Sequence, residues 1–269
     1  MTSESVAAAS PVTHGWRPVH GIQMYYEVHG AGGSVPLVLL HGGGSTIDAT
    51  YGRLLPWVAR HRRVIAVEEQ AHGRTSDRDA PERFETSADD VAELLAQLGV
   101  ASADIMGFSN GASVALQVAI RHPARVRKLV FASSMTRRSG TRPEFWDFIA
   151  KASFAGMPQV LKDAFLRVTP DPQKLRRMYD RDIERMQHFR DVPDADVAAI
   201  AAPVLIVAGD RDVPTTEHAV ELSRLIPHAR LVILPGGHGD YLGEVLTPRD
   251  PRYPELTAWL IERFLDAAE

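Results

Sequence analysis

The sequence predicts an α/β protein with a mostly parallel, doubly wound sheet and a helical cap inserted late in that sheet. The first reason is that short apolar runs rich in β-branched residues alternate with amphipathic helical patterns along most of the chain. Strands buried on both faces give continuous apolar runs, and the helices between them cover the sheet. The second reason is that this alternation stops at about 136–200, where helical periods carry Phe, Trp, Met and Tyr instead.

The predicted strands follow a regular order. Near the N-terminus, "RPVHG" and "IQMYYEVHG" are typical of an antiparallel hairpin, which would give the sheet a mixed edge. Six apolar runs come after it, at 36–42, 62–70, 103–109, 126–134, 202–210 and 229–237. Right-handed crossovers bring the carboxyl ends of parallel strands to one side of a sheet. We therefore expect the functional site at that edge.

The same pattern divides the chain into parts. Residues 1–18 are expected to be a disordered tail. They have neither the basic start nor the long apolar stretch of a signal peptide. The core is expected at 19–135 and 201–269, with the helical cap at 136–200. Most cap aromatics should pack within the cap, while a minority that includes Trp146 should line a pocket over the site. The charged run "QKLRRMYDRDIER" predicts a solvated helix face with i,i+4 pairs.

Composition excludes several classes of function. The net charge of −4 gives no electrostatic reason to expect nucleic acid or an anionic membrane as a partner. The chain has no cysteine, which excludes disulfides, thiolate catalysis and cysteine-based metal sites. No apolar run approaches the length needed to span a bilayer. We expect a soluble, cytoplasmic protein that acts on a small molecule, and the sequence leaves its oligomeric state open.

Chemically capable residues follow four of the predicted strands. The run "LLHGGGS" places three glycines, Gly42–Gly44, after one strand, and "MGFSNG" places Ser109 between two glycines after another. A third strand ends in "IVAGDRDVP", which offers Asp210 and Asp212, and the last ends in "LPGGHGDY", which offers His238. A serine, an acid, a histidine and a glycine-rich loop thus fall at the same predicted edge.

These residue types act together in the catalysis of acyl transfer. A serine hydroxyl becomes a strong nucleophile when a base removes its proton, and histidine can take that proton and later return it. An acid fixes the histidine tautomer and stabilises the imidazolium. The oxyanion formed at the attacked carbonyl needs preorganised donors, for which the backbone N–H groups of Gly43 and Asn110 are the candidates. Asn110 follows Ser109 and opens the next predicted helix, where free N–H groups favour negative charge.

With these motifs the sequence resembles the α/β-hydrolase superfamily from about residue 19 onward. The matching pieces are "HGGG", "GFSNG" as G-x-S-x-G, "GDRD" and "GGH", in the family's chain order Ser…Asp…His. The resemblance implies an α/β-hydrolase fold and a serine hydrolase that needs neither metal nor organic cofactor. It implies Ser109 as nucleophile, His238 as base and Asp212 as acid, leaving Asp210 to bond the turn. Its substrate pocket would include Gly44, Phe108 and Val213.

One loop departs from the family pattern. The stretch "QAHGRTSD" resembles a loop that usually reads Asp-x-x-Gly-His-Gly-x-Ser, and here Gln70 and Ala71 replace the more usual residues. The resemblance implies a structural role for this loop, so the departure leaves the mechanism intact. His41 is expected to support the oxyanion loop and His72 the loop at 70–77.

The sequence favours a carboxylesterase acting on small or medium esters or lactones and leaves other readings open. One is a carbon–carbon bond hydrolase of ring-cleavage products, although such enzymes typically carry Pro-Gly-Ala where this chain has "HGGGSTIDA". A perhydrolase is also compatible with the triad. A non-catalytic small-molecule receptor on the same fold is the alternative from another class. Ser109 in the nucleophile position argues against dehalogenases and epoxide hydrolases, which use Asp there.

Overall fold

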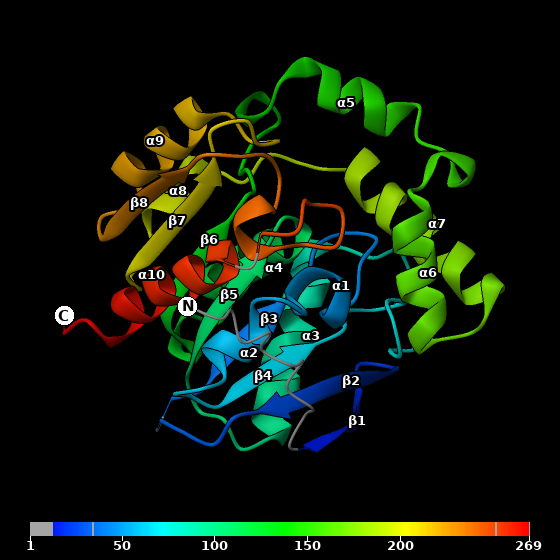
Figure 1. The fold of residues 1–269 in the computed structure, drawn as a ribbon, viewed down its shortest axis with the longest axis horizontal. Helices are drawn as coiled ribbons and strands as arrows, with labels where there is room; N and C mark the ends of the chain where they lie inside the picture. The colour runs from blue at the N-terminus through cyan, green and yellow to red at the C-terminus, as the bar shows by residue number, and fades with distance from the viewer. Residues whose placement is uncertain (1–12, 34, 251, 269) are drawn as a thin grey trace.

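In the described part of the chain, eight strands form one sheet in the order β1-β2-β4-β3-β5-β6-β7-β8 (Figure 1). The computed structural model describes residues 13–33, 35–250 and 252–268. The strands are β1 (Thr13–Val19), β2 (Ile22–His29), β3 (Leu37–Leu40), β4 (Val64–Val67), β5 (Ala103–Phe108), β6 (Val126–Ala132), β7 (Val204–Gly209) and β8 (Ala229–Leu234). The six predicted apolar runs each contain one of the strands from β3 to β8.

The antiparallel hairpin lies at one edge of the sheet, as predicted. β1 pairs antiparallel with β2, and β2 pairs antiparallel with β4, whereas the pairs from β4 to β8 are parallel. The expected tail at 1–18 is wrong in its last part, because β1 begins at Thr13 and pairs in register with β2 up to Val19. Packing of Trp16 on Tyr25, with ring centroids 5.1 Å apart, helps to hold this strand. The tail before Thr13 lies outside the described residues.

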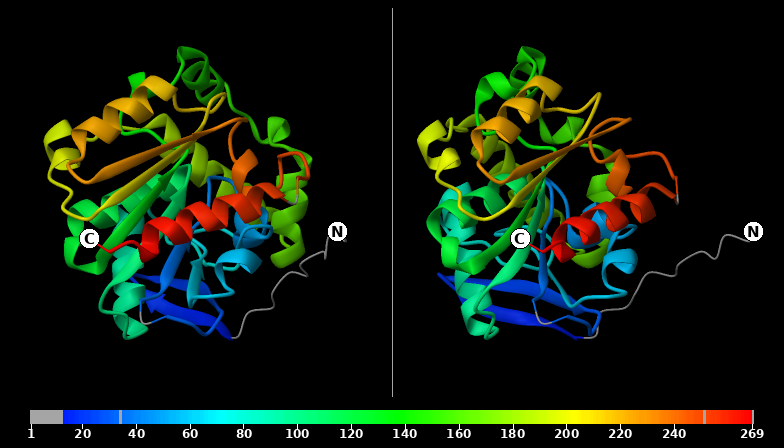
Figure 2. Two further views of the ribbon diagram at one scale, coloured as in Figure 1. Left: turned by 60° about the vertical axis from the view of Figure 1, so that its left-hand side comes forward. Right: turned by 90° about the vertical axis from the view of Figure 1, so that its left-hand side faces the viewer.

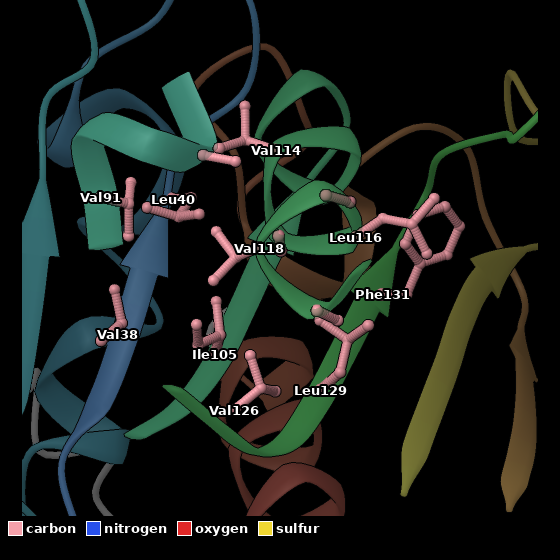
Figure 3. Close-up of a cluster of buried hydrophobic side chains, with 14 of the residues drawn as sticks. Val38, Leu40, Val91, Ile105, Val114, Leu116, Val118, Val126, Leu129 and Phe131 are labelled. Carbon is pink, nitrogen blue, oxygen red and sulfur yellow. The ribbon is translucent and has the colours of Figure 1, made fainter. Parts of the chain in front are cut away.

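The strands from β3 to β8 contribute alternate side chains to two hydrophobic layers. Val38 and Leu40 face a layer covered by α3 (Phe84–Gln97), α4 (Asn110–Arg121) and α9 (Thr216–Leu225), part of which Figure 3 shows. Leu37 and Leu39 face a layer covered by α1 (Ile47–Tyr51), α2 (Leu55–Val58) and α10 (Arg252–Asp266). Figure 2 shows α10, in red, crossing this second face. Burial on both faces explains why the parallel strands are continuous apolar runs.

The expected helix after β3 is divided in two. Gly52 caps the end of α1, and Pro56 lies in the first turn of α2. Proline is favoured in a first turn because the N–H that it lacks would have no partner there. Two short helices therefore replace the single long one that the periodicity favours.

Between β6 and β7 the chain forms helices, of which the first three lie along the top and right of Figure 1 and the last lies at the left beside β7. They are α5 (Pro143–Ala150), α6 (Gln159–Val168), α7 (Pro172–Gln187) and α8 (Asp194–Ala198). Met157, Phe165 and Met178 from this segment pack in one cluster with Ala49 and Ala71 of the core. This helical segment therefore packs against α1, which follows β3, and against the loop that follows β4. Among the described residues, no helix combines the length and the apolarity needed to cross a bilayer.

Candidate active site

Ser109 lies in a tight turn between β5 and α4. Its backbone has φ 55° and ψ −122°, a conformation that costs a non-glycine residue energy and that marks functional turns. A Cβ added to Gly107 would lie 2.0 Å from the carbonyl oxygen of Gly111, and one added to Gly111 would lie 2.2 Å from that of Leu40. Only glycine fits at these two positions, which explains the G-x-S-x-G pattern around Ser109.

A hydrogen-bonded chain joins the three predicted catalytic residues. The Nε2 atom of His238 is 3.1 Å from the Ser109 Oγ, and its Nδ1 atom is 2.6 Å from the Asp212 Oδ1. Asp212 accepts only, so the Nδ1–H form of His238 satisfies this bond and leaves the Nε2 lone pair toward the serine hydroxyl. The loops after β5, β7 and β8 thus bring together residues that are far apart in the sequence.

The Asp212 carboxylate is held by the loop around it. Its Oδ1 also accepts a hydrogen bond from the Val213 N–H at 2.7 Å, and its Oδ2 accepts one from the Gly209 N–H at 2.9 Å. Burial opposes the charge, but the hydrogen bond and charge of His238, with the bonds from Gly209 and Ser133, keep the pKa of Asp212 below its usual value. The acid is therefore ionised and fixed in direction. Asp210 instead accepts from the Gly236 N–H at 2.8 Å and bonds the turn.

Two residues that the sequence analysis missed support Asp212. The Ser133 hydroxyl donates to Asp212 Oδ2, so the buried Tyr241 hydroxyl, 2.6 Å from the Ser133 Oγ, donates to Ser133 in turn. Ser133 has a positive φ of 52° and follows β6 at the same edge as Ser109. Its position at the end of the predicted run 126–134 was the available signal, whereas no pattern in the sequence marks Tyr241.

The two predicted oxyanion donors adjoin each other beside Ser109. Asn110 is the first residue of α4, where backbone N–H groups have no acceptor within the helix. A Cβ added to Gly42 would lie 3.6 Å from the Ser109 Cβ, and one added to Gly43 would lie 2.4 Å from the Asn110 Nδ2. The glycine loop therefore runs against the nucleophile turn with no room for side chains at Gly43.

His41 bonds the glycine loop and His72 bonds its own loop at 70–77, in line with the roles expected for them. The Nδ1 atom of His41 is 2.8 Å from the Gly42 carbonyl, and its Nε2 atom accepts from the Glu69 N–H at 3.1 Å. Burial, reinforced by neighbouring His72, lowers the pKa of His41 to about 4, so the ring is neutral. His72 lies 2.8 Å through Nδ1 from the Gln70 carbonyl. The departure at Ala71 leaves a non-glycine residue at φ 62°.

Three of the four expected pocket residues lie next to the triad or the glycine loop. The Phe108 ring packs on the His238 ring, with centroids 4.7 Å apart. Gly44, with φ 63°, lies near Met157 of the helical segment between β6 and β7, and the Met157 Cε is 3.9 Å from the position of an added Cβ. Val213 adjoins Asp212 through the bond given above. Their contact with substrate stays a prediction.

Trp146 belongs to another cluster. Its indole N–H donates to the Arg138 carbonyl at 2.8 Å, and the Arg138 guanidinium lies 3.8 Å from the ring centroid. The ring also packs against Phe145 and Phe189, with centroid distances of 5.0 and 5.3 Å. No described contact joins it to Ser109, so its place in an acyl pocket stays a prediction.

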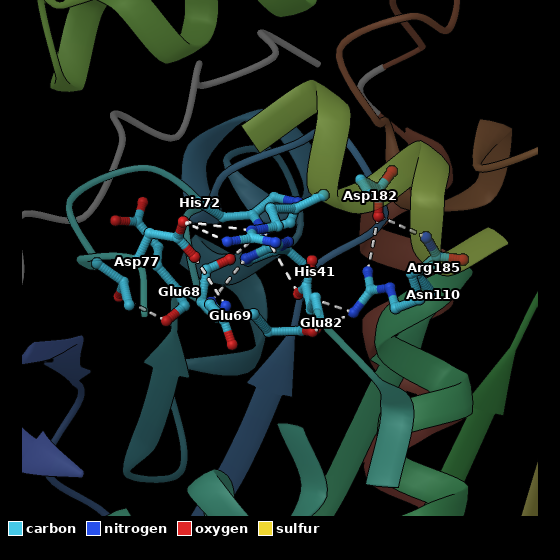
Figure 4. A network of polar contacts seen from close by, with 12 residues as sticks. His41, Glu68, Glu69, His72, Asp77, Glu82, Asn110, Asp182 and Arg185 are labelled. Carbon is cyan, nitrogen blue, oxygen red and sulfur yellow. Dashed lines mark hydrogen bonds and ion pairs between the residues drawn. The ribbon is translucent and has the colours of Figure 1, made fainter. Parts of the chain in front are cut away.

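A buried ionic network reaches the site from α7 (Figure 4). The Arg185 guanidinium donates to Glu69 at 2.9 Å, to Glu82 at 2.9 Å and to Asp182 at 2.7 Å. Asp182 also accepts from the Asn110 Nδ2 at 2.8 Å. The expected solvated face is therefore wrong for Asp182 and Arg185, which are buried. Their exposed neighbours on α7 follow the expectation, as the i,i+4 pair of Arg176 and Asp180 shows.

Comparison with known proteins agrees with this geometry. A model of the alpha/beta hydrolase fold family matches residues 35–185. The chain is 36% identical over 112 residues to the 2-hydroxymuconate semialdehyde hydrolase of Pseudomonas sp. (strain CF600), covering 40% of this chain and 39% of that protein. It is 33% identical over 148 residues to a pimeloyl-[acyl-carrier protein] methyl ester esterase of Yersinia enterocolitica, covering 54% and 53%. The chain thus spans about half, or less, of the length of these two relatives.

Solved structures extend the similarity over nearly the whole chain. An N-acyl homoserine lactone degrading enzyme has a TM-score of 0.70 at 27% identity, covering 94% of this chain and 100% of that one. The 2-hydroxy-6-oxo-6-phenylhexa-2,4-dienoate hydrolase of Rhodococcus sp. strain RHA1 has a TM-score of 0.76 at 22% identity, covering 96% and 99%, and shows the fold alone. The family match, the sheet order and the placement of the turns lead to one conclusion: the chain belongs to the α/β-hydrolase fold family, whose named relatives here are hydrolases and esterases.

Proposed function

We propose that this protein is a cofactor-independent serine hydrolase that cleaves small or medium carboxylic esters or lactones. The hydrogen-bonded chain from Asp212 through His238 to Ser109 is the observation that carries the proposal. The names of two similar proteins, a methyl ester esterase and an acyl homoserine lactone degrading enzyme, favour ester or lactone substrates. We further propose that 136–200 acts as a cap over the substrate, since Met157 lies next to Gly44.

In the proposed mechanism Ser109 Oγ attacks the carbonyl carbon as His238 Nε2 takes the hydroxyl proton. The oxyanion is stabilised by the backbone N–H groups of Gly43 and Asn110. Collapse of the intermediate expels the alcohol, which leaves with the proton from His238, and an acyl-enzyme remains. Water then attacks the acyl carbon, giving its proton to His238, and the acid is released when Ser109 regains that proton. Asp212 stays ionised throughout and stabilises the imidazolium.

Initial rates on p-nitrophenyl esters of increasing acyl length test this proposal, with the variant Ser109→Ala. We expect saturable turnover that falls at least about a thousandfold in the variant, because the nucleophile is lost. The matched control is Ser113→Ala, since Ser113 lies one turn further along α4 and bonds Ser134. A fluorophosphonate probe should label the wild type and not the Ser109 variant. Equal activity in wild type and Ser109→Ala, or absence of labelling, would overturn the assignment and favour a receptor.

A second candidate function is carbon–carbon bond hydrolysis of ring-cleavage products. The 36% identity to a 2-hydroxymuconate semialdehyde hydrolase favours it. The same nucleophile, base and acid would serve, so the substrate decides between the two. Turnover of a 2-hydroxy-6-oxo-dienoate with a higher kcat/KM than any p-nitrophenyl ester would make this the primary activity.

A further inference from the structure

Asp182 brings a carboxylate from α7 against both proposed oxyanion donors. Its Oδ1 accepts from the Asn110 Nδ2 at 2.8 Å. A Cβ added to Gly43 would lie 2.6 Å from its Oδ2 and 3.0 Å from its Oδ1. The Asp182 carboxylate thus bonds the side chain of Asn110, the residue that follows Ser109, and also lies against the glycine loop at Gly43. The proposed mechanism gives it no task.

One oxygen of this carboxylate has no hydrogen-bond donor among the described residues. Oδ1 is shared by Asn110 and Arg185, whereas Oδ2 accepts no hydrogen bond from any residue that the structure describes. Asp182 as a residue is only 8% exposed, and its side chain retains 11% of its accessible surface. Oδ2 is not one of the fully buried side-chain oxygens that lack a partner, so it remains open to water. When a substrate excludes that water, the ionised oxygen needs another donor. A donor group on a bound substrate would satisfy it.

The surroundings leave Asp182 negative. Burial opposes its charge, but Arg185 beside it, His72 nearby and the Asn110 amide keep the pKa of Asp182 below its usual value. Arg185 divides its two terminal nitrogens among three carboxylates, those of Asp182, Glu69 and Glu82. Burial raises the pKa of Glu82 to about 7, so this acid carries only part of its charge at neutral pH, but Arg185 is still shared between Asp182 and Glu69. Since both terminal nitrogens are already bound, Arg185 is also poorly placed to receive a carboxylate from a substrate.

We propose that Asp182 makes the site charge-selective: its Oδ2 receives an ammonium or other hydrogen-bond donor a few bonds from the scissile carbonyl and disfavours substrates with an anionic group there. This inference rests on the proposed ester hydrolase function. A substrate cation would also shield the developing oxyanion from Asp182, whereas an anion would add to the repulsion. Ring-cleavage dienoates, which carry a carboxylate, would then be poor substrates.

Three p-nitrophenyl esters on one short acyl scaffold test the inference: 3-ammoniopropionate, butyrate and 3-sulfonatopropionate, which carry one positive charge, none and one negative charge. In the wild type we expect kcat/KM to fall in that order, by about tenfold per step, as for a charge-assisted hydrogen bond gained or lost. In Asp182→Asn the ammonium advantage should fall below about twofold, and the sulfonate-to-butyrate ratio should rise several-fold. Asp180→Asn, on the exposed face of the same helix, is the control and should keep the wild-type ratios.

The outcomes separate this inference from the function on which it rests. Butyrate turnover that depends on Ser109, with no charge order or with the same order in Asp182→Asn, overturns charge selection and leaves the hydrolase in place. Wild-type preference for the sulfonate overturns it even where Asp182→Asn does not fold. Absence of turnover of any ester, or turnover that survives Ser109→Ala, overturns the hydrolase proposal and this inference with it.

Discussion

The Ser133 hydroxyl donates a hydrogen bond to Asp212 from a residue with positive φ, and the Tyr241 hydroxyl donates one to Ser133. The Ser133 and Tyr241 hydroxyls together hold Asp212 Oδ2, whereas Oδ1 bonds His238. In Ser133→Ala we expect kcat to fall about ten- to hundredfold with little change in KM, because a hydrogen bond to a charged group contributes about 1.5–3 kcal/mol. Steady-state kinetics on the preferred p-nitrophenyl ester provide the measurement.

Ser134→Ala is the matched control for this prediction. Ser134 is the neighbouring buried serine, and its hydroxyl lies 2.9 Å from that of Ser113 rather than near Asp212. An equal loss of kcat in both variants would mean that general disturbance after β6, and not support of Asp212, lowers the rate.

Gly43 has room for hydrogen only. In Gly43→Ala the new methyl group would lie 2.4 Å from the Asn110 Nδ2 and 2.6 Å from the Asp182 Oδ2, so the loop must move. We expect kcat/KM to fall about 10²–10³-fold, the usual effect of losing one oxyanion donor. Gly156→Ala is the control, since its methyl group would meet no atom closer than 3.5 Å. Full activity in Gly43→Ala would remove this residue from the oxyanion site.

Among the functional residues, the sequence predicts the ones that directly follow a strand. It does not predict the ones in the helical segment between β6 and β7. Ser109, Asp212 and His238 were identifiable because each follows an apolar run that ends at one sheet edge. Asp182 was not, because it lies in a run rich in charged residues and only the fold reveals that this turn of α7 faces inward. Tyr241 likewise lies in a loop whose path depends on the whole site.

On α7, burial separates two kinds of ion pair. Arg185→Met would leave the buried carboxylates of Glu69, Glu82 and Asp182 without their counter-ion, and we expect the free energy of unfolding to fall by about 3–5 kcal/mol. Chemical denaturation followed by far-UV circular dichroism gives the value.

The same helix supplies the control. Arg176 pairs with Asp180 in solvent, so Arg176→Met should cost less than about 1 kcal/mol. Comparable losses in the two variants would show that the network around Arg185 contributes no more than a surface pair.

For the whole molecule, buried Glu68 makes stability depend on pH. Burial raises the pKa of Glu68 to about 7, although Arg74 opposes the rise. Between pH 4.5 and about 7 the unfolded chain therefore releases this proton before the folded chain does, and the contribution of Glu68 to stability falls by roughly 3 kcal/mol as pH rises. His41 acts in the opposite sense, since its lowered pKa removes stability as pH falls from 6.5 toward 4.

Glu68→Gln isolates the first effect. We expect the difference in unfolding free energy between variant and wild type to shift in favour of the variant as pH rises from 5 to 7.5. Urea titrations at several pH values provide the curve. A difference that stays constant with pH would mean that Glu68 titrates alike in the folded and unfolded chains.

The sheet as a whole was predictable because β3 to β7 are buried on both faces and are therefore largely apolar, while the partly exposed edge strand β8 still carries the apolar run "LVIL". The division of α1 from α2 required attention to Gly52 and Pro56, which periodicity alone ignores. β1 escaped prediction in its first half because an edge strand exposed on one side, here "THGWRPV", has no apolar run. The boundaries of the cap at 136–200 stay a prediction.

The bond between Asp182 and Asn110 bears on how such enzymes can be recombined. A chimaera that took its helical insertion from a relative would remove the acceptor of Asn110 and the counter-ion of Glu69 and Glu82 in one step. The donor insertion would then have to supply both, or the recipient core would have to change at 69, 82 and 110. In this chain the insertion and the core depend on each other through these contacts. We therefore expect a transplanted insertion to function only when the contacting positions on both sides are exchanged together.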